Sequence, residues 1–381
     1  MLRHMDDMSR RRFLNCTRAY LLGGFAGSAF PGLIPKRAWA REIPSSSVRS
    51  QDWLTLTEER VLEPELRIID PHHHLWDRPG NRYLLEDLIA DIGAHNVRQT
   101  VFVECTSMYR ADGPEEFKVV GETEFVEGIA ARSASGQYGD TRVATGIVGS
   151  ANLRLGDRVV SVLEAQIAAS PKRFRGIRHR AAWGDPSVAP NQAEDLPRHV
   201  LLDPVFRKGY AHLRTYGLSF EGWVYHTDIA DLADLARTFP DTPIIFNHLG
   251  GPIGVGSFAG RSDEVFAAWK PAVAELAKCQ NVVAKVGGIQ MMVNGYRWHE
   301  RDRPPTSDEL LNSNAKWYHY IIEQFGPDRC MFESNFPVDR LSCSYTVLWN
   351  QFKKLTLGFS TDERAAMFHD TAMRVYRLAR L

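Results

Sequence analysis

Short runs of β-branched and other apolar residues alternate with segments of helical spacing along most of this chain of 381 residues. The apolar runs predict strands at 67–74, 98–104, 142–149, 174–179, 218–225, 243–247, 281–286 and 329–334. The helical segments include 117–131, 158–169, 229–239, 264–278, 310–325 and 345–355. Strands that alternate with helices pair in parallel through right-handed crossovers, and eight such units close into a barrel. We therefore expect a single α/β domain, a (β/α)8 TIM-type barrel, over residues 67–381.

An open, doubly wound sheet is the alternative fold for this pattern. The first predicted strand is not followed by the glycine-rich turn G-x-G-x-x-G, which argues against it. Two connections, 180–202 and 287–308, are longer than ordinary turns, and each follows a predicted strand. In a barrel both would form long loops at the C-terminal face, where TIM barrels have their active sites.

The first forty residues have the composition of a targeting segment rather than of a domain. Residues 9–14, Ser-Arg-Arg-Arg-Phe-Leu, resemble the twin-arginine signal pattern, and the small-x-small sequence 38–40 resembles a cleavage site. The apolar run between them is short and interrupted by glycines, so we expect no stable membrane span in the mature form. The sequence therefore predicts a twin-arginine signal peptide over 1–40, a linker over 41–66, and a periplasmic protein exported by the twin-arginine machinery.

Composition excludes some classes of function. The chain has 46 Lys and Arg against 46 Asp and Glu, so its formal net charge is zero and nucleic acid is not an expected partner. The five cysteines include no C-x-x-C pair, which gives no support to a thiolate metal site.

Three consecutive histidines, His72, His73 and His74, end the first predicted strand. Residues two apart on a strand share a face, so we expect Asp70, His72 and His74 to point one way and His73 the other. Two neutral imidazoles at a strand end suit a borderline-soft divalent cation, or they donate hydrogen bonds to a developing oxyanion. This strand end is the first candidate for a site.

Further candidates follow other strands. His226 and His248 come after the fifth and sixth strands, which adds two imidazoles at the same mouth of the barrel. Glu104 follows the apolar second strand, where a carboxylate needs a cation, a metal or a hydrogen-bond donor. Arg178 and His179 both end the fourth strand, and alternation allows only one of them to face the lumen. We favour Arg178, because its guanidinium suits a substrate carboxylate.

Four segments, 69–77, 175–179, 247–252 and 331–338, together resemble the amidohydrolase superfamily. The similarity is to the amidohydrolase-2 branch, which includes sugar lactonases and pyrone-dicarboxylate lactonase. This resemblance implies a distorted (β/α)8 barrel and hydrolysis of a small lactone or a related cyclic ester or amide. It leaves the metal open, since some relatives use one divalent ion and others use none.

The sequence departs from this family at the eighth strand. Relatives carry an aspartate there, in the context G-S-D-x-P, as general base, whereas this chain has Asn335. An amide accepts no proton at neutral pH. Glu333 lies two residues earlier on the same strand face and is the first replacement base, with Glu104 second and Asp339 third.

The site predicted from the sequence has three parts. We expect His72, His74 and Glu104 to hold one divalent ion, with Zn²⁺ the best match to the donors, unless the protein works without metal. The residues that we expect to be catalytic are His226, His248, Glu333 and Asn335. Arg178 and His179 are the candidates for binding a small-molecule substrate, and the arginine would suit one that carries a carboxylate. Two other functions stay open: a decarboxylase or hydratase of an unsaturated or aromatic acid, and a periplasmic binding protein without catalysis.

Overall fold

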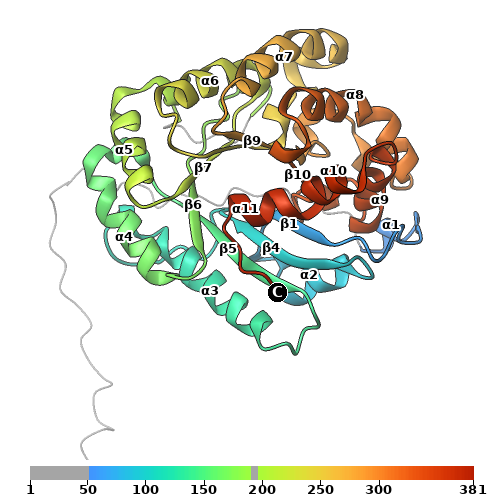
Figure 1. Ribbon diagram of the computed structural model, residues 1–381, viewed down its shortest axis with the longest axis horizontal. Coiled ribbons are helices and arrows are strands. Elements are labelled where there is room, and N and C mark those ends of the chain that lie inside the picture. Colours follow the sequence, from blue (N-terminus) through green and yellow to red (C-terminus); the bar gives the residue numbers. More distant parts are fainter. Residues whose placement is uncertain (1–50, 190–195) are drawn as a thin grey trace, which may run out of the picture. The chain divides into compact units, whose positions relative to one another are not determined.

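The computed structural model describes residues 51–189 and 196–381, which form an eight-stranded parallel sheet surrounded by helices (Figure 1). Its strands are β1 (Ile68–His73), β4 (Val97–Val103), β5 (Arg142–Ser150), β6 (Phe174–Arg178), β7 (Ser219–Gly222), β8 (Ile244–Phe246), β9 (Val282–Gly287) and β10 (Cys330–Glu333). Their order in the sheet follows their order in the chain. Each of them overlaps a predicted strand, because β-branched runs between helical segments are a reliable local signal.

The sheet curls so that its first and last strands meet. A parallel bridge joins His73 to Phe336, and the backbone N–H of His74 donates to the carbonyl of Phe336 at 2.7 Å. The N–H of Asn335 donates to the carbonyl of His72 at 2.9 Å. These contacts complete a nearly closed (β/α)8 barrel, as predicted. A small antiparallel hairpin, β2 (Trp76–Arg78) with β3 (Asn81–Tyr83), follows β1.

Most of the helices lie outside the barrel (Figure 1). They are α2 (Leu85–Ile92), α3 (Val120–Ala134), α4 (Val159–Ala169), α5 (Pro204–Thr215), α6 (Ile229–Thr238), α7 (Ser262–Ala277), α8 (Ser307–Phe325), α9 (Tyr345–Leu355) and α10 (Thr361–Ala365). Of these, α2, α5 and α10 were not predicted from the sequence. Helix α5 has clear signals, since Asp203 caps the N–H of Val205 at 2.8 Å and Pro204 occupies the first turn.

The lumen of the barrel is built in layers. The lower layer is apolar and includes Ile245, Val283 and Met331, and Tyr376 beyond α11 (Thr371–Val375) packs against it from the N-terminal end. Along a strand, residues two positions apart point to the same face of the sheet. The next layer therefore receives the polar residues Asn247, Lys285 and Glu333, all of them buried. This alternation sets the height of the site.

The segment before the barrel has an ordered part. It begins with α1 (Gln51–Leu54), and the indole of Trp53 donates to the carbonyl of Arg301 at 3.0 Å. The N–H of Leu62 donates to the Asn350 side chain at 3.0 Å. Residues 51–62 of the predicted linker thus contact the barrel through these hydrogen bonds.

The predicted signal peptide, residues 1–40, lies outside the described residues. The twin-arginine export route and the periplasmic location therefore stay predictions, as do the proposed domain boundaries. Among the described helices, none combines the length and the apolar character needed to cross a bilayer.

Candidate active site

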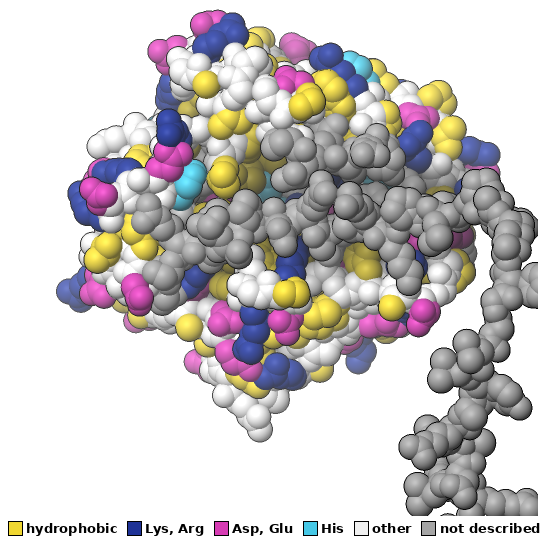
Figure 2. All heavy atoms as spheres, turned by 180° about the vertical axis from the view of Figure 1, so that it is seen from behind, with side chains coloured by type: hydrophobic (Ala, Val, Ile, Leu, Met, Phe, Trp, Pro, Cys, Tyr) yellow, Lys and Arg dark blue, Asp and Glu magenta, His cyan; other side chains and the backbone are white. Residues whose placement is uncertain are grey.

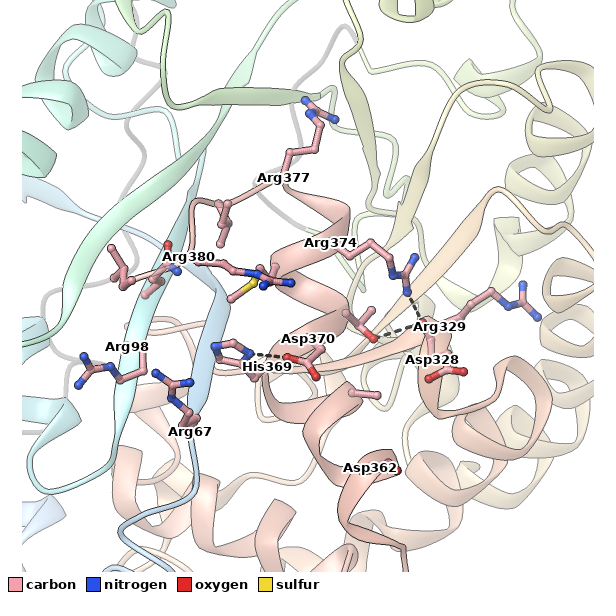
Figure 3. Close-up of a pocket in the computed structure, with 16 residues that line it drawn as sticks. Arg67, Arg98, Asp328, Arg329, Asp362, His369, Asp370, Arg374, Arg377 and Arg380 are labelled. Carbon is pink, nitrogen blue, oxygen red and sulfur yellow. Dashed lines mark hydrogen bonds and ion pairs between the residues drawn. The ribbon is translucent and has the colours of Figure 1, made fainter.

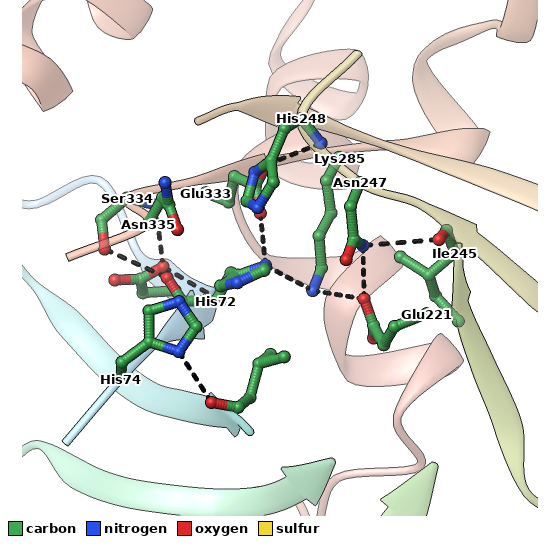
Figure 4. A network of polar contacts seen from close by, with 12 residues as sticks. His72, His74, Glu221, Ile245, Asn247, His248, Lys285, Glu333, Ser334 and Asn335 are labelled. Carbon is green, nitrogen blue, oxygen red and sulfur yellow. Dashed lines mark hydrogen bonds and ion pairs between the residues drawn. The ribbon is translucent and has the colours of Figure 1, made fainter. Parts of the chain in front are cut away.

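Two imidazoles and a carboxylate converge at the C-terminal end of the barrel (Figure 4). His72 belongs to β1, Glu333 to β10, and His248 begins the 3-10 turn η6 (His248–Gly250) after β8. Nδ1 of His72 lies 2.8 Å from Oε2 of Glu333, and Nδ1 of His248 lies 2.8 Å from Oε1. All three side chains are buried. The barrel therefore brings together side chains from three strands that are far apart in sequence.

A glycine makes room for His248. A Cβ built on Gly288, just beyond β9, would lie 1.9 Å from Nδ1 of His248, and Gly288 has a φ of +65°. Both the space and the backbone conformation therefore require glycine at this position. On its other side, the His248 ring packs edge-on against Trp223 with centroids 4.7 Å apart.

His72 is held neutral by its surroundings. Burial is the main reason why its pKa is lowered well below the usual range, and the nearby Lys285 lowers it further. Nζ of Lys285 lies 3.1 Å from Nδ1 of His72, and Nη1 of Arg178 lies 3.4 Å from Nε2. A neutral imidazole keeps a lone pair that is able to bind a metal or accept a proton.

Lys285 forms a buried ion pair that the sequence analysis missed. Its Nζ donates to Oε2 of Glu221 at 2.8 Å, and both side chains have no exposed surface. Glu221 also accepts hydrogen bonds from Nδ2 of Asn247 and from the hydroxyl of Tyr376. A signal for both residues was available, because each is the only charged residue of a short and otherwise buried strand.

Arg178 faces the lumen, where it pairs with Glu104. Its Nε donates to Oε1 of Glu104 at 2.7 Å, and its Nη2 donates to the carbonyl of the same residue. Glu104 is thereby engaged by a guanidinium and is not part of the cluster formed by His72, His248 and Glu333. The prediction that Glu104 holds a metal together with His72 is therefore not supported, because the carboxylate of Glu104 pairs with the guanidinium of Arg178 instead.

His179 lies on the outer side of the barrel. Its ring packs edge-on against Phe206 of α5, with centroids 5.2 Å apart. Its Nδ1 accepts from the N–H of Leu153 at 3.2 Å. Because adjacent residues of a strand point to opposite faces, Arg178 and not His179 faces the lumen, as predicted.

His74 lies beside His72 but faces a different partner. Its Nδ1 donates to the carbonyl of Val103 at 2.7 Å, and the rings of His72 and His74 are 4.9 Å apart. Burial lowers its pKa well below the usual range, so the ring is neutral and its Nε2 carries the lone pair. His74 is close enough to line the site, although it is not one of the three clustered groups.

The expected alternation fails at Asp70. The pairing of β1 with β4 shifts register between Asp70 and His73. Asp70 instead accepts hydrogen bonds from the N–H of Ser334 at 3.0 Å and from the hydroxyl of Tyr345 at 3.1 Å. His73 does point away from the site, with Nε2 2.8 Å from Oγ1 of Thr100.

His226 is held by loop residues. Its Nδ1 accepts from the N–H of Ile253 at 3.3 Å, and its ring packs edge-on against Phe258. Burial lowers its pKa to about 4. The ring is therefore neutral at pH 7 with its proton on Nε2. Its contacts within the described residues are with this loop and not with His72, His248 or Glu333.

Asn335 binds one of the three candidate bases. Its Nδ2 donates to Oδ1 of Asp339 at 2.9 Å, and the N–H of Gln290 donates to Oδ2 at 3.2 Å. Burial raises the pKa of Asp339 well above its usual range, which favours the protonated acid. Of the candidates Glu333, Glu104 and Asp339, only Glu333 contacts the histidines.

The residues present fit a divalent ion. One ligand atom each of His72, His248 and Glu333 lie within 4.8 Å of one another. Oε2 of Glu333 is buried, and no group among the described residues donates a hydrogen bond to it, although Nδ1 of His72 is 2.8 Å away. Two imidazoles and one carboxylate form a donor set that suits Zn²⁺.

Comparisons with known proteins give one consistent result. The profile of the amidohydrolase family matches residues 69–378. The uncharacterized protein y4mH of Sinorhizobium fredii is 32% identical over 337 residues, which cover 82% of this chain and 99% of that protein. An L-fucono-1,5-lactonase of Burkholderia multivorans is 26% identical over 320 residues, which cover 81% of this chain and 96% of that protein. A crystal structure of an amidohydrolase from Burkholderia multivorans with bound Zn shares the fold, with a TM-score of 0.63 and 23% identity over 82% of this chain and 99% of the other.

Proposed function

Because this chain belongs to the amidohydrolase family, we propose that it is a hydrolase that opens the ring ester of a small, sugar-derived lactone. The observation that carries the proposal is Glu333, a buried carboxylate placed between His72 and His248, one oxygen of which accepts no hydrogen bond from residues 51–189 and 196–381. The similarity to an L-fucono-1,5-lactonase supports this class of substrate.

His72, His248 and Glu333 would hold one divalent ion, and Zn²⁺ is the ion that their donor atoms suit best. When bound, such an ion supplies Lewis acidity and lowers the pKa of a water molecule towards about 7. The low pKa of His72 keeps its imidazole unprotonated and free to ligate.

Glu333 would take the part that an aspartate has in relatives of this branch. Oε2, which accepts no hydrogen bond from the described residues, would accept the proton of the attacking water and return it to the ring oxygen that leaves, while Oε1 would remain for the ion. Asn335 accepts no proton, and its amide instead donates to Asp339. The base thus comes from one step deeper in the same strand.

Arg178 would position the substrate. Its Nε and Nη2 donate hydrogen bonds to Glu104, which holds the guanidinium in one orientation. Its Nη1 lies 3.4 Å from Nε2 of His72. A guanidinium held in this way is suited to the ester carbonyl or to a substrate carboxylate.

The test of the reaction is proton release from a panel of sugar 1,4- and 1,5-lactones, followed with a pH indicator. We expect turnover by the wild type and a fall in kcat/KM of at least about 100-fold in Glu333→Gln. Glu323→Gln, an exposed glutamate on α8, is the matched control and should retain full activity. Full activity of Glu333→Gln, or no turnover of any lactone, would refute the proposal.

The metal is tested separately by elemental analysis of the purified protein. We expect about one divalent ion per chain in the wild type and its loss in His248→Ala. His319→Ala, which changes an exposed histidine on α8, should leave the metal content unchanged. Unchanged lactonase activity after complete removal of metal by a chelator would contradict the metal site but not the hydrolase.

A further inference from the structure

A cleft of about 1010 Å³ opens at the N-terminal end of the barrel, on the opposite side from the candidate active site (Figure 3). It is formed by residues at or just before the beginnings of β1, β4 and β10 and by the C-terminal segment from α10 onward. Six arginines line it: Arg67, Arg98, Arg329, Arg374, Arg377 and Arg380. The acidic residues of the lining are Asp328, Asp362 and Asp370.

The charges of these arginines are not neutralised. Within residues 51–189 and 196–381, none of the six forms an ion pair, and the lining holds six arginines against three aspartates. Asp370 is engaged by Nδ1 of His369 at 2.7 Å. The cleft therefore concentrates positive charge on a chain whose formal net charge is zero.

Backbone carbonyls hold two of the guanidinium groups in place. Arg329 donates to the carbonyls of Ala277, Cys279, Val282 and Phe325 at 2.9 to 3.3 Å. Arg374 donates to the carbonyl of Asp328. A carbonyl fixes the orientation of a guanidinium but leaves its full positive charge in place.

Other arginines of the cleft keep unused donors. Nε of Arg98 is buried without an acceptor in the part of the chain that the structure describes. Arg67 and Arg380 are exposed, and among the described residues neither side chain makes a hydrogen bond. On the opposite face of the molecule, acidic and basic side chains are interspersed (Figure 2). The cleft thus presents guanidinium donors that no acceptor among the described residues occupies.

We propose that this cleft binds a small polyanion, a ligand with more than one phosphate, sulfate or carboxylate group. Guanidinium groups bind such oxyanions through paired N–H donors. Arginines from β4, from the residues just before β1 and β10, and from the C-terminal segment surround one hollow, so separate anionic groups of one ligand find separate partners. The volume of the cleft is in the range of small-molecule sites. A ligand bound here would not contact His72, His248 or Glu333, because these lie at the other ends of the strands.

The experiment is titration of the full chain with inorganic tripolyphosphate, citrate and sulfate, followed by calorimetry at two salt concentrations. We expect saturable binding of tripolyphosphate with one site per chain, tighter than that of sulfate. In the double variant Arg67→Gln/Arg380→Gln the affinity should fall about fivefold or more, since two unpaired charges are lost. Both positions are exposed and free of hydrogen bonds, so the variant should melt at the wild-type temperature.

The matched control is Arg214→Gln, an exposed arginine that pairs with Asp241 far from the cleft. It should bind tripolyphosphate as the wild type does. Absence of saturable binding, or equal loss in the control and the double variant, would overturn the proposal. Binding of a single-stranded oligonucleotide more tightly than tripolyphosphate would also overturn it, because a polymer would then be the ligand. Citrate bound more tightly than tripolyphosphate would identify carboxylates as the anionic groups and would still support it.

Discussion

Replacing Lys285 by methionine removes the ammonium that pairs with Glu221 inside the barrel. Both side chains have no exposed surface, and their N–O distance is 2.8 Å. In Lys285→Met the Glu221 carboxylate stays buried but loses its cation, which typically destabilises a fold by about 3 to 5 kcal/mol. Glu221 keeps its hydrogen bonds from Asn247 and Tyr376, so we expect the lower end, about 3 kcal/mol.

The assay is urea unfolding at pH 7, followed by far-UV circular dichroism. The comparison includes Glu221→Gln and the double variant, which form a double-mutant cycle. In the double variant neither charge remains unpaired, so its loss of stability should be smaller than the sum of the single losses by at least about 1 kcal/mol. Lys278→Met is the control, because Lys278 forms an exposed pair with Glu275 and should change stability by less than about 0.5 kcal/mol.

A Lys285→Met protein as stable as the Lys278→Met control would refute the reasoning. Strict additivity of the two single variants would do the same, because it would mean that Lys285 and Glu221 do not interact in the folded protein.

Three further predictions concern other parts of the molecule. In Gly288→Ala the new Cβ would lie 1.9 Å from Nδ1 of His248, and displacement of the imidazole should lower kcat/KM by about 100-fold or more in steady-state kinetics. The control Gly80→Ala, with no atom within 4 Å of the new Cβ, should keep the wild-type kcat/KM. Equal kcat/KM values in the two variants would mean that His248 has no role. Burial lowers the pKa of His95 to about 3, so on acidification the unfolded chain takes up a proton at this histidine before the folded protein does, and stability falls as the pH drops below about 6.5. Between pH 6.5 and 5, His95→Gln should lose about 2 kcal/mol less of its free energy of unfolding than the wild type in urea titrations. The same loss of stability in both proteins would contradict this. Tyr376→Ala should open a cavity under the apolar layer and destabilise the fold by about 3 to 5 kcal/mol. Tyr376→Phe loses only the hydrogen bond to Glu221 and should cost about 1 kcal/mol. Equal melting temperatures of the two variants would exclude a packing role for the ring.

The sequence by itself determined the barrel and the height of its site. Apolar runs and helical spacing are local properties, so all eight strands could be predicted within a few residues of their observed bounds. Because strand ends meet at one mouth, His72, His248 and Glu333 could also be expected near each other.

Tertiary structure decided which of these side chains meet. His72 reaches Glu333 because closure of the barrel brings β1 beside β10, and local periodicity contains no information about closure. Glu104 is drawn to Arg178 from another strand, and the register shift in β1 turns Asp70 away from the site. The ion pair of Lys285 and Glu221 likewise joins β9 to β7 across the lumen. Spacing along one strand fixes the face of a side chain, but its partner depends on strands that only the folded barrel places opposite it.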